Sequence, residues 1–229
     1  MTISVKRRFK MDNLVGPQYK FVISEIVNLR WTDLDKSELT AVAAAYYYFS
    51  IQFRENLLTA VAMFPDDEKL QHLKTEECDT ANLSPWAGVA SPEERMNHDE
   101  FMRRTLLLST LPAEATNAAE QAGLAYLQKS RGYDPDARAR SIASYEDGGL
   151  EATFRAMLTA PQWGSPALEA FRHFLAEHIR FDSDPDQGHG ALSRHLQPDD
   201  RVLPMWEDFR DLLICAVPRL SAGVDYNAL

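Results

Sequence analysis

Helix-start signals recur along this chain, and no segment alternates apolar and polar residues as a β-strand would. Proline follows a capping residue in Ser91-Pro92-Glu93-Glu94, in Asp134-Pro135 and in Ser165-Pro166. Proline favours the first turn of a helix, and a Ser or Asp before it accepts hydrogen bonds from the unpaired backbone N–H groups. Apolar residues recur every three or four positions, which is the period of a helix. The pattern therefore predicts an all-α bundle of about seven to eight helices.

The 229 residues contain no Gly/Ser-rich or Pro-rich linker, so we expect a single domain over residues 1–229. The longest helix is expected to follow Ser37 and to run through Phe64, where Pro65-Asp66-Asp67 ends it and opens the next one. Further helices are expected to begin at residues 92 and 112, to run from 135 toward 158, and to cover 166–181 and 205–217.

Composition excludes several classes of function. The net charge of −10 argues against a nucleic-acid surface, which needs a basic patch. The longest apolar stretch, residues 41–53, is too short to span a bilayer, and the N-terminal residues lack the apolar core of a secretory signal. The two cysteines form no disulfide framework. We therefore expect a cytoplasmic protein that binds neither nucleic acid nor membranes.

Two histidines near the end of the helix expected after Ser165 lie on different faces. Residues three and four apart share a helix face, so Phe171, Leu175, His178 and Asp182 form one row. His173 belongs to a second row, which is polar throughout. His178 and Asp182 are therefore expected to point toward the core, and His173 toward solvent.

Other polar residues also fall on apolar faces, namely Glu77, His98 and Glu146. A single one of these has an ordinary explanation, as a hydrogen-bonded core histidine or as a salt-bridge partner. Several buried carboxylates on different helices are costly unless a cation offsets them. With a histidine of the stretch that follows, His189 or His195, the polar residues on apolar faces make three imidazoles and three carboxylates. Such a set is typical of a helical bundle that binds two iron or manganese ions.

Five short stretches, LKTEECD, NHDEF, ASYEDGG, EHIRFD and GHGAL, carry a resemblance to a known family. In this order they resemble the ligand pattern of the heme-oxygenase-like diiron oxidases and oxygenases. The resemblance covers about residues 40–196 and implies a heme-oxygenase-like helical bundle that binds two iron ions, or manganese ions, and no heme. The metal ligands that it implies are Glu77, His98, Glu146, His178, Asp182 and His189.

Two departures from the family pattern leave ligands open. The interval between residues 77 and 98 is long, so Glu76 or Glu94 is an alternative for the first glutamate. The interval between residues 182 and 189 is also longer than in the family, so Asp186 or His195 is an alternative to His189.

The resemblance implies an enzyme that uses O2 to oxidise a small amine, amino acid or fatty-acid-like substrate in a biosynthetic pathway. The reactions of the family are N-oxygenation, desaturation and oxidative C–C cleavage. Heme oxygenase itself is disfavoured, because no histidine precedes His72 to serve as the axial ligand in the first helix. The alternative is a metal-free relative of the same fold, either a thiaminase-like hydrolase with Cys78 as nucleophile or a small-molecule-binding protein. The sequence leaves the oligomeric state open, a homodimer included.

Residues for a substrate pocket are less well defined. On the long helix, Tyr46, Tyr47 and Tyr48 either line a pocket or pack in the core, and Gln52 and Glu55 are further lining candidates. A substrate carboxylate has three candidate partners, each with a surface salt bridge as the alternative: Arg54, Arg103 and Arg104.

Overall fold

The computed structural model describes residues 17–81, 83–182 and 188–221, with the side chain of Asp182 outside that description. The described residues form ten α-helices and no β-strand, which confirms the predicted all-α class. The helices are α1 (Tyr19–Val27), α2 (Lys36–Met63), α3 (Glu68–Cys78), α4 (His98–Leu107), α5 (Ala113–Arg131), α6 (Pro135–Glu146), α7 (Gly149–Met157), α8 (Pro166–Asp182), α9 (His189–Ser193) and α10 (Leu203–Ala216). The structure has more helices than the seven to eight predicted, because the expected helix from 135 to 158 is divided in two and the short helices α1 and α9 were not expected.

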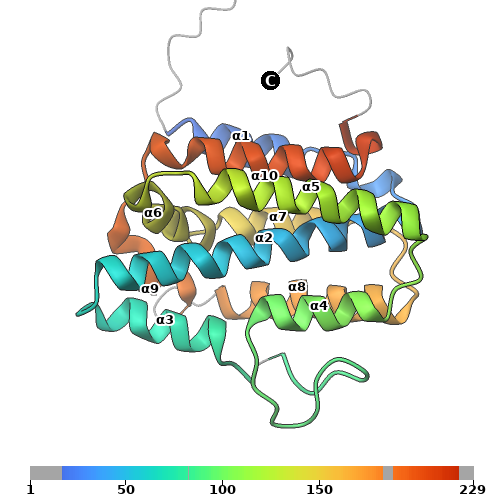
Figure 1. The fold of residues 1–229 in the computed structure, drawn as a ribbon, viewed down its shortest axis with the longest axis horizontal. Coiled ribbons are helices and arrows are strands. Elements are labelled where there is room, and N and C mark those ends of the chain that lie inside the picture. The colour runs from blue at the N-terminus through green and yellow to red at the C-terminus, as the bar shows by residue number, and fades with distance from the viewer. Residues whose placement is uncertain (1–16, 82, 183–187, 222–229) are drawn as a thin grey trace, which may run out of the picture.

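The long helix α2 crosses the middle of the bundle (Figure 1) and contacts α3, α4, α5, α6, α8 and α10. It begins at a complete capping box, in which Asp35 accepts from the backbone N–H of Glu38 and the Glu38 carboxylate accepts from Asp35. Both bonds satisfy N–H groups that a helix start leaves unpaired. In the view of Figure 1, α1, α5 and α10 lie above α2, and α3, α4 and α8 lie below it.

Aromatic side chains from α2, α6 and α10 form the centre of the core. The rings of Phe49 and Phe209 lie 4.1 Å apart, and Tyr145 meets Phe49 and Trp206 edge-on at 5.1 and 5.0 Å. All four side chains are completely buried. Burial of each such ring contributes about 1.5–3 kcal/mol, so this cluster fixes the positions of the helices around α2.

A glycine pair separates α6 from α7 directly after Glu146. Gly148 has a φ of 88°, which favours glycine. A Cβ atom on Gly149 would lie 2.3 Å from the Ser144 carbonyl oxygen and 2.7 Å from the Trp206 ring. The chain can therefore turn sharply at the end of α6 only because both residues lack side chains, and Glu146 ends its helix facing the core.

The expected helix start at residues 91–94 is wrong. Ser91 donates its N–H to the Glu94 carboxylate at 2.9 Å, as in half of a capping box, but Glu93 takes a φ of 65° and the chain continues as a turn. The helix starts instead at His98, where the Asn97 side chain accepts from the backbone N–H of Glu100 at 2.8 Å. A local cap pattern predicts a helix only when helical residues follow it, and here Met96 instead forms an antiparallel bridge with Thr80.

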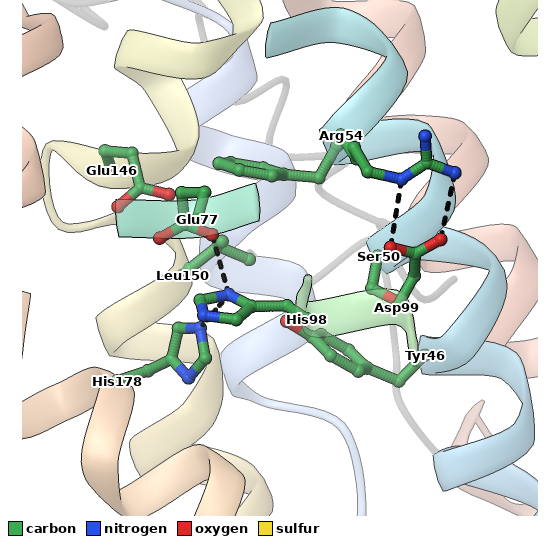
Figure 2. Close-up of a pocket in the computed structure, with 10 residues that line it drawn as sticks. Tyr46, Ser50, Arg54, Glu77, His98, Asp99, Glu146, Leu150 and His178 are labelled. Atoms are coloured by element: carbon green, nitrogen blue, oxygen red, sulfur yellow. Dashed lines mark hydrogen bonds and ion pairs between the residues drawn. The ribbon is translucent and has the colours of Figure 1, made fainter. Parts of the chain in front are cut away.

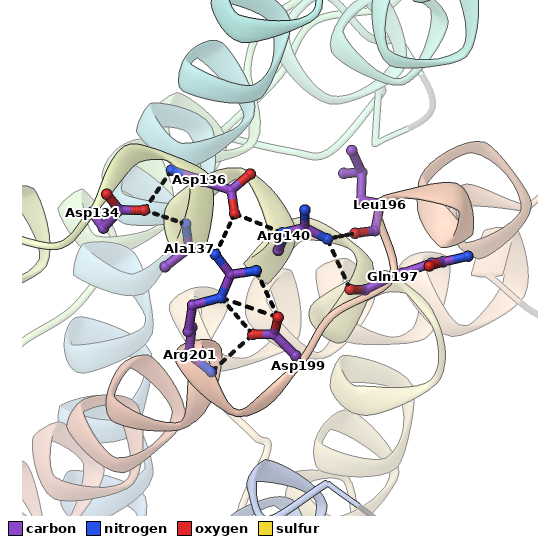
Figure 3. A network of polar contacts seen from close by, with 8 residues as sticks. All are labelled: Asp134, Asp136, Ala137, Arg140, Leu196, Gln197, Asp199 and Arg201. Atoms are coloured by element: carbon purple, nitrogen blue, oxygen red, sulfur yellow. Dashed lines mark hydrogen bonds and ion pairs between the residues drawn. The ribbon is translucent and has the colours of Figure 1, made fainter.

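A polar network fixes the segment after α9 onto α6 (Figure 3). Arg140 donates to the carbonyl oxygens of Leu196 and Gln197 at 2.7 and 3.2 Å. The Asp136 carboxylate pairs with both Arg140 and Arg201, at 2.7 Å in each case. The segment that begins with α9 is therefore held on the helix that ends at Glu146.

None of the helices in the described ranges combines the length and the apolar character that a bilayer crossing requires.

Candidate metal centre

Glu77 stands at the centre of a buried polar cluster. It is the penultimate residue of α3, and its side chain is 4% exposed, on the same face as the buried Leu70 and Leu73. Its neighbour Glu76 lies on the outer side of the helix, with a side chain that is 37% exposed. Consecutive residues of a helix are rotated by about 100° about its axis, which places Glu77 inside and Glu76 outside.

The first group of possible ligands joins Glu77 to His98 and His178. Glu77 Oε2 lies 2.7 Å from His98 Nδ1, and His178 Nε2 lies 3.0 Å from the same nitrogen (Figure 2). His178 Nδ1 donates to the Phe174 carbonyl oxygen at 2.8 Å, so its Nε2 carries a lone pair toward the group. Two acceptors, Glu77 Oε2 and His178 Nε2, thus face His98 Nδ1, and this nitrogen can donate at most one proton. A cation between the three groups would satisfy all of them.

The second group joins Glu77 to Glu146 and His189. Glu77 Oε1 lies 2.9 Å from His189 Nδ1, and Glu146 Oε2 lies 3.3 Å from it. All three side chains are at most 4% exposed. In each group the ligand atoms lie within 4.8 Å of one another, which makes both groups able to hold a metal ion.

The two groups share Glu77, which offers a different oxygen to each. Oε2 faces the first group and Oε1 faces the second. Two carboxylates and three imidazoles are a donor set that suits iron, manganese or zinc ions. One further atom supports the fit: His98 Nε2 is buried and makes no hydrogen bond within the described residues. The residues present therefore fit a metal ion in either group, and Glu77 belongs to both.

The pKa shifts favour the metal-binding protonation states of two of these residues, Glu77 and His178. Burial raises the pKa of the Glu77 carboxyl, but attraction to His98 and His189 outweighs burial and holds the pKa well below its ordinary value. Burial, with His98 as the second cause, lowers the pKa of His178 to about 3. An ionised carboxylate and a neutral imidazole are the forms that donate electron pairs to a metal ion.

Outer contacts orient the second group. Glu76 Oε2 lies 3.6 Å from His189 Nε2, on the ring edge opposite to Glu77. The interaction with His189 lowers the pKa of Glu76. A carboxylate behind a histidine ligand is a common arrangement that fixes the ring orientation. Gly190 adds a steric condition, because a Cβ atom there would lie 3.0 Å from the Glu146 carbonyl oxygen. Close packing of α9 on the end of α6 thus depends on this glycine.

No protein-family model, no curated protein and no solved structure matches this chain. The case for a metal centre therefore comes from the arrangement of its side chains. Five of the six ligands expected from the sequence meet in the two groups: Glu77, His98, Glu146, His178 and His189. The sixth, Asp182, is the last residue of α8, and its side chain lies outside the described residues.

The alternative ligands occupy other places. Glu94 pairs with Arg104 at 2.7 Å, and His195 pairs with Asp67 at the start of α3. Glu76 contacts His189 from outside, as described above, and belongs to neither group. Asp186 lies outside the described residues. His173 is separate from both groups, as expected, but it does not simply face solvent: it is half-buried and stacks on Trp86 with ring centroids 4.5 Å apart.

A narrow pocket adjoins the first group. It encloses about 10 Å³, which is room for about one water molecule. Four residues of α2 line it at helical spacing, and the others come from the ligand helices and α7: Tyr46, Ser50, Phe53, Arg54, Glu77, His98, Asp99, Glu146, Leu150 and His178. Among the expected lining residues only Tyr46 and Arg54 are present.

The remaining lining candidates have structural roles. Tyr47 and Tyr48 pack edge-on against each other at 5.1 Å, and both are half-buried. Gln52 is buried between Tyr126 and Tyr145, with the nearest hydroxyl–amide distance at 3.2 Å to each. Packing therefore explains Tyr47 and Tyr48, as the alternative interpretation proposed, and Gln52 has a structural role instead of the expected place in the pocket wall.

Two features of the site were missed by sequence reasoning. One is the outer position of Glu76 behind His189, and the other is Asp99, which pairs with Arg54 at the pocket. Arg54 lies one turn of α2 after Ser50 and two turns after Tyr46, so its position on the same helix face could have been inferred from the sequence. Its pairing with Asp99, which directly follows the candidate ligand His98, could not have been inferred, because no local pattern encodes the approach of α4 to α2.

Proposed function

We propose that this chain is a non-heme enzyme with two iron ions, or two manganese ions, that uses O2 to oxidise a small molecule. The substrate classes are an amine, an amino acid or a fatty acid, and the reactions are N-oxygenation, desaturation or oxidative C–C cleavage. The observation that carries the proposal is the position of Glu77, one carboxylate with an oxygen directed at each of two buried ligand groups. Iron bound there would supply the activation of O2.

The residues of the chain would bind the metal ions, orient the ligand side chains and exclude water from the site. Glu77 and Glu146 would offset half of the four positive charges of two ferrous ions, and Asp182, one turn beyond His178, remains the sequence-based candidate for a third carboxylate. The Phe174 carbonyl fixes the ring of His178 so that Nε2 faces the metal. The rings of Phe154 and Phe174 pack on His178 at 5.7 and 4.2 Å and exclude water from that side.

The metal-free hydrolase alternative has less support. Its nucleophile would be Cys78, but burial, together with the negative charge of Glu77, raises the pKa of that thiol to about 12. A nucleophilic cysteine needs a lowered pKa, because the thiolate is the reactive form. The alternative also gives no role to the three histidines that meet at Glu77.

Anaerobic loading with Fe(II), followed by exposure to O2, tests the proposal. The loaded chain should consume O2 faster than free Fe(II) at the same concentration, with further acceleration by a compound from one of the three substrate classes. Glu146→Gln should abolish the difference, whereas Asp147→Asn, which alters a surface pair with Arg194, should retain it. Iron that binds without any faster uptake of O2 would contradict the oxidase.

A further inference from the structure

An ion pair forms the side of the pocket away from Glu146 (Figure 2). Arg54 of α2 donates from Nε and Nη2 to the two carboxylate oxygens of Asp99 on α4, and both distances are 2.9 Å. The side chains are 31% and 12% exposed, whereas those of the metal ligands lining the pocket are at most 8% exposed. The pair therefore lies between the ligand groups and solvent.

The pair differs from the other arginines that were candidates for binding a substrate. Arg103 and Arg104 both bind the Glu100 carboxylate, Arg104 binds Glu94 as well, and neither lines the pocket. Arg54 keeps one end of its guanidinium available, since Nη1 makes no hydrogen bond to any described residue. Arg54 is thus the arginine placed to receive a molecule that enters toward the metal centre.

Charge balance restricts what can replace this pair. A pocket with room for about one water molecule admits a larger molecule only if side chains of its wall move, and Arg54 and Asp99 are the two lining residues that are not fully buried. A simple carboxylic acid on Arg54 would then leave Asp99 largely buried without a cation. A simple amine on Asp99 would leave Arg54 without an anion. Because the Asp99 side chain is only 12% exposed, loss of its cation is unfavourable, whereas a molecule with both charges replaces one ion pair by two.

We propose that Arg54 and Asp99 bind the head group of a zwitterionic α-amino acid, with its carboxylate on Arg54 and its ammonium group on Asp99. The inference rests on the proposed function, in which this pocket receives the molecule that is oxidised, and it selects one of the three substrate classes. The substrate side chain would lie along Tyr46, Phe53 and Leu150, which supply the apolar part of the pocket wall. In the free protein, the ion pair closes the pocket until the substrate replaces it.

Calorimetric titration tests the inference without any need for turnover. The probes are the twenty proteinogenic L-amino acids, titrated into metal-free protein and into protein loaded with Mn(II). For each amino acid that binds, the matching amine without the carboxylate and the matching acid without the amino group serve as further probes. We expect at least one amino acid to bind, and both truncated compounds to bind at least about tenfold more weakly, because each leaves one charge of the partly buried pair without a partner.

The chain offers a matched control on the same helix. The double variant Arg54→Gln/Asp99→Asn removes both charges of the pocket pair and should weaken amino-acid binding by at least about tenfold. Glu55→Gln/Arg131→Gln removes the adjacent pair between α2 and α5, which is also bidentate at 2.8 and 2.6 Å, and should bind as the wild type does. Should the first double variant fail to fold, Arg54→Lys keeps the charge, loses the bidentate geometry and should show the same weakening.

The inference is overturned if no amino acid binds either form of the protein, if the truncated compounds bind equally well, or if both double variants retain full binding. Metal analysis of the same samples tests the proposed function independently of the amino-acid site. A protein that binds amino acids through Arg54 but takes up no metal would refute the oxidase and leave the head-group site intact.

Discussion

Replacement of Glu77 by glutamine should remove both metal sites at once, although it exchanges only one oxygen for an amide nitrogen. Glu77 is the one residue that belongs to both ligand groups of the described chain. The matched control is Glu76→Gln, one position earlier on α3. Glu76 is 37% exposed and lies 3.6 Å from His189, so its loss affects an outer contact only.

The expected magnitude follows from linkage between binding and folding. A ligand at one hundred times its dissociation constant stabilises the folded state by about 2.7 kcal/mol, so two ions would contribute about 5 kcal/mol. For a domain of this size, about 1 kcal/mol shifts the melting temperature by 2–4 °C. Wild-type protein should therefore melt about 10–20 °C higher with Fe(II) than without it.

Anaerobic melting followed by circular dichroism measures this shift for each variant against its own metal-free form, which cancels any effect of the substitution on the fold. Glu77→Gln should retain less than about a quarter of the wild-type shift, and Glu76→Gln should retain most of it. Equal shifts in the two variants, or a full shift in Glu77→Gln, would refute the shared-carboxylate arrangement.

Three other outcomes are expected. His178→Ala should lose iron binding while His173→Ala keeps it, as metal analysis after desalting would reveal; similar losses would mean that the two faces of α8 are not distinguished. Gly149→Ala should lower the free energy of unfolding by about 1–3 kcal/mol or more, because its Cβ meets a backbone oxygen at 2.3 Å. Gly164→Ala, with nothing within 4 Å, should leave the denaturant midpoint nearly unchanged. Hydrogen bonds from Arg201 lower the pKa of Asp199 to about 2. The stability that this carboxylate contributes is therefore present above about pH 4 and is lost as the pH falls toward 2. Asp199→Asn should flatten the acid unfolding curve in that window and cost less than about 1 kcal/mol at pH 7, since the side chain is 47% exposed; an unchanged acid limb would contradict this.

Much of the helical architecture could be predicted from local sequence. The start of α6 at Pro135 and of α8 at Pro166 follow the cap signals, because capping depends on residues that are neighbours in the chain. The same signal at Ser91 was misleading, since only a turn formed there. The break at Gly148, which has a φ of 88°, was also missed as a helix end, and the need for glycine at position 149 could not be inferred locally, because it comes from the close approach of Trp206 on a distant helix.

Some residues of the candidate site could likewise be placed from the sequence, and others could not. Helical periodicity separates the buried His178 from His173, which is half-buried away from the ligand groups, and it places Glu77 rather than Glu76 on the buried face of α3. The position of His189 could not be derived in this way, because it follows the end of α8 and depends on how α9 packs onto α6. That packing comes from Gly190 and from the contacts of Arg140, which connect residues far apart in the sequence.

The most direct test of the central claim is a crystal structure of the Fe(II)-loaded protein, with anomalous diffraction recorded at the iron edge. We expect two peaks on either side of the Glu77 carboxylate, one beside His98 and His178 and the other beside Glu146 and His189. Metal analysis of the same protein should give about two irons per chain, as in carboxylate-bridged bundles. A loaded crystal with no peak at Glu77, or with a single peak at one group and iron bound elsewhere, would contradict the dinuclear centre.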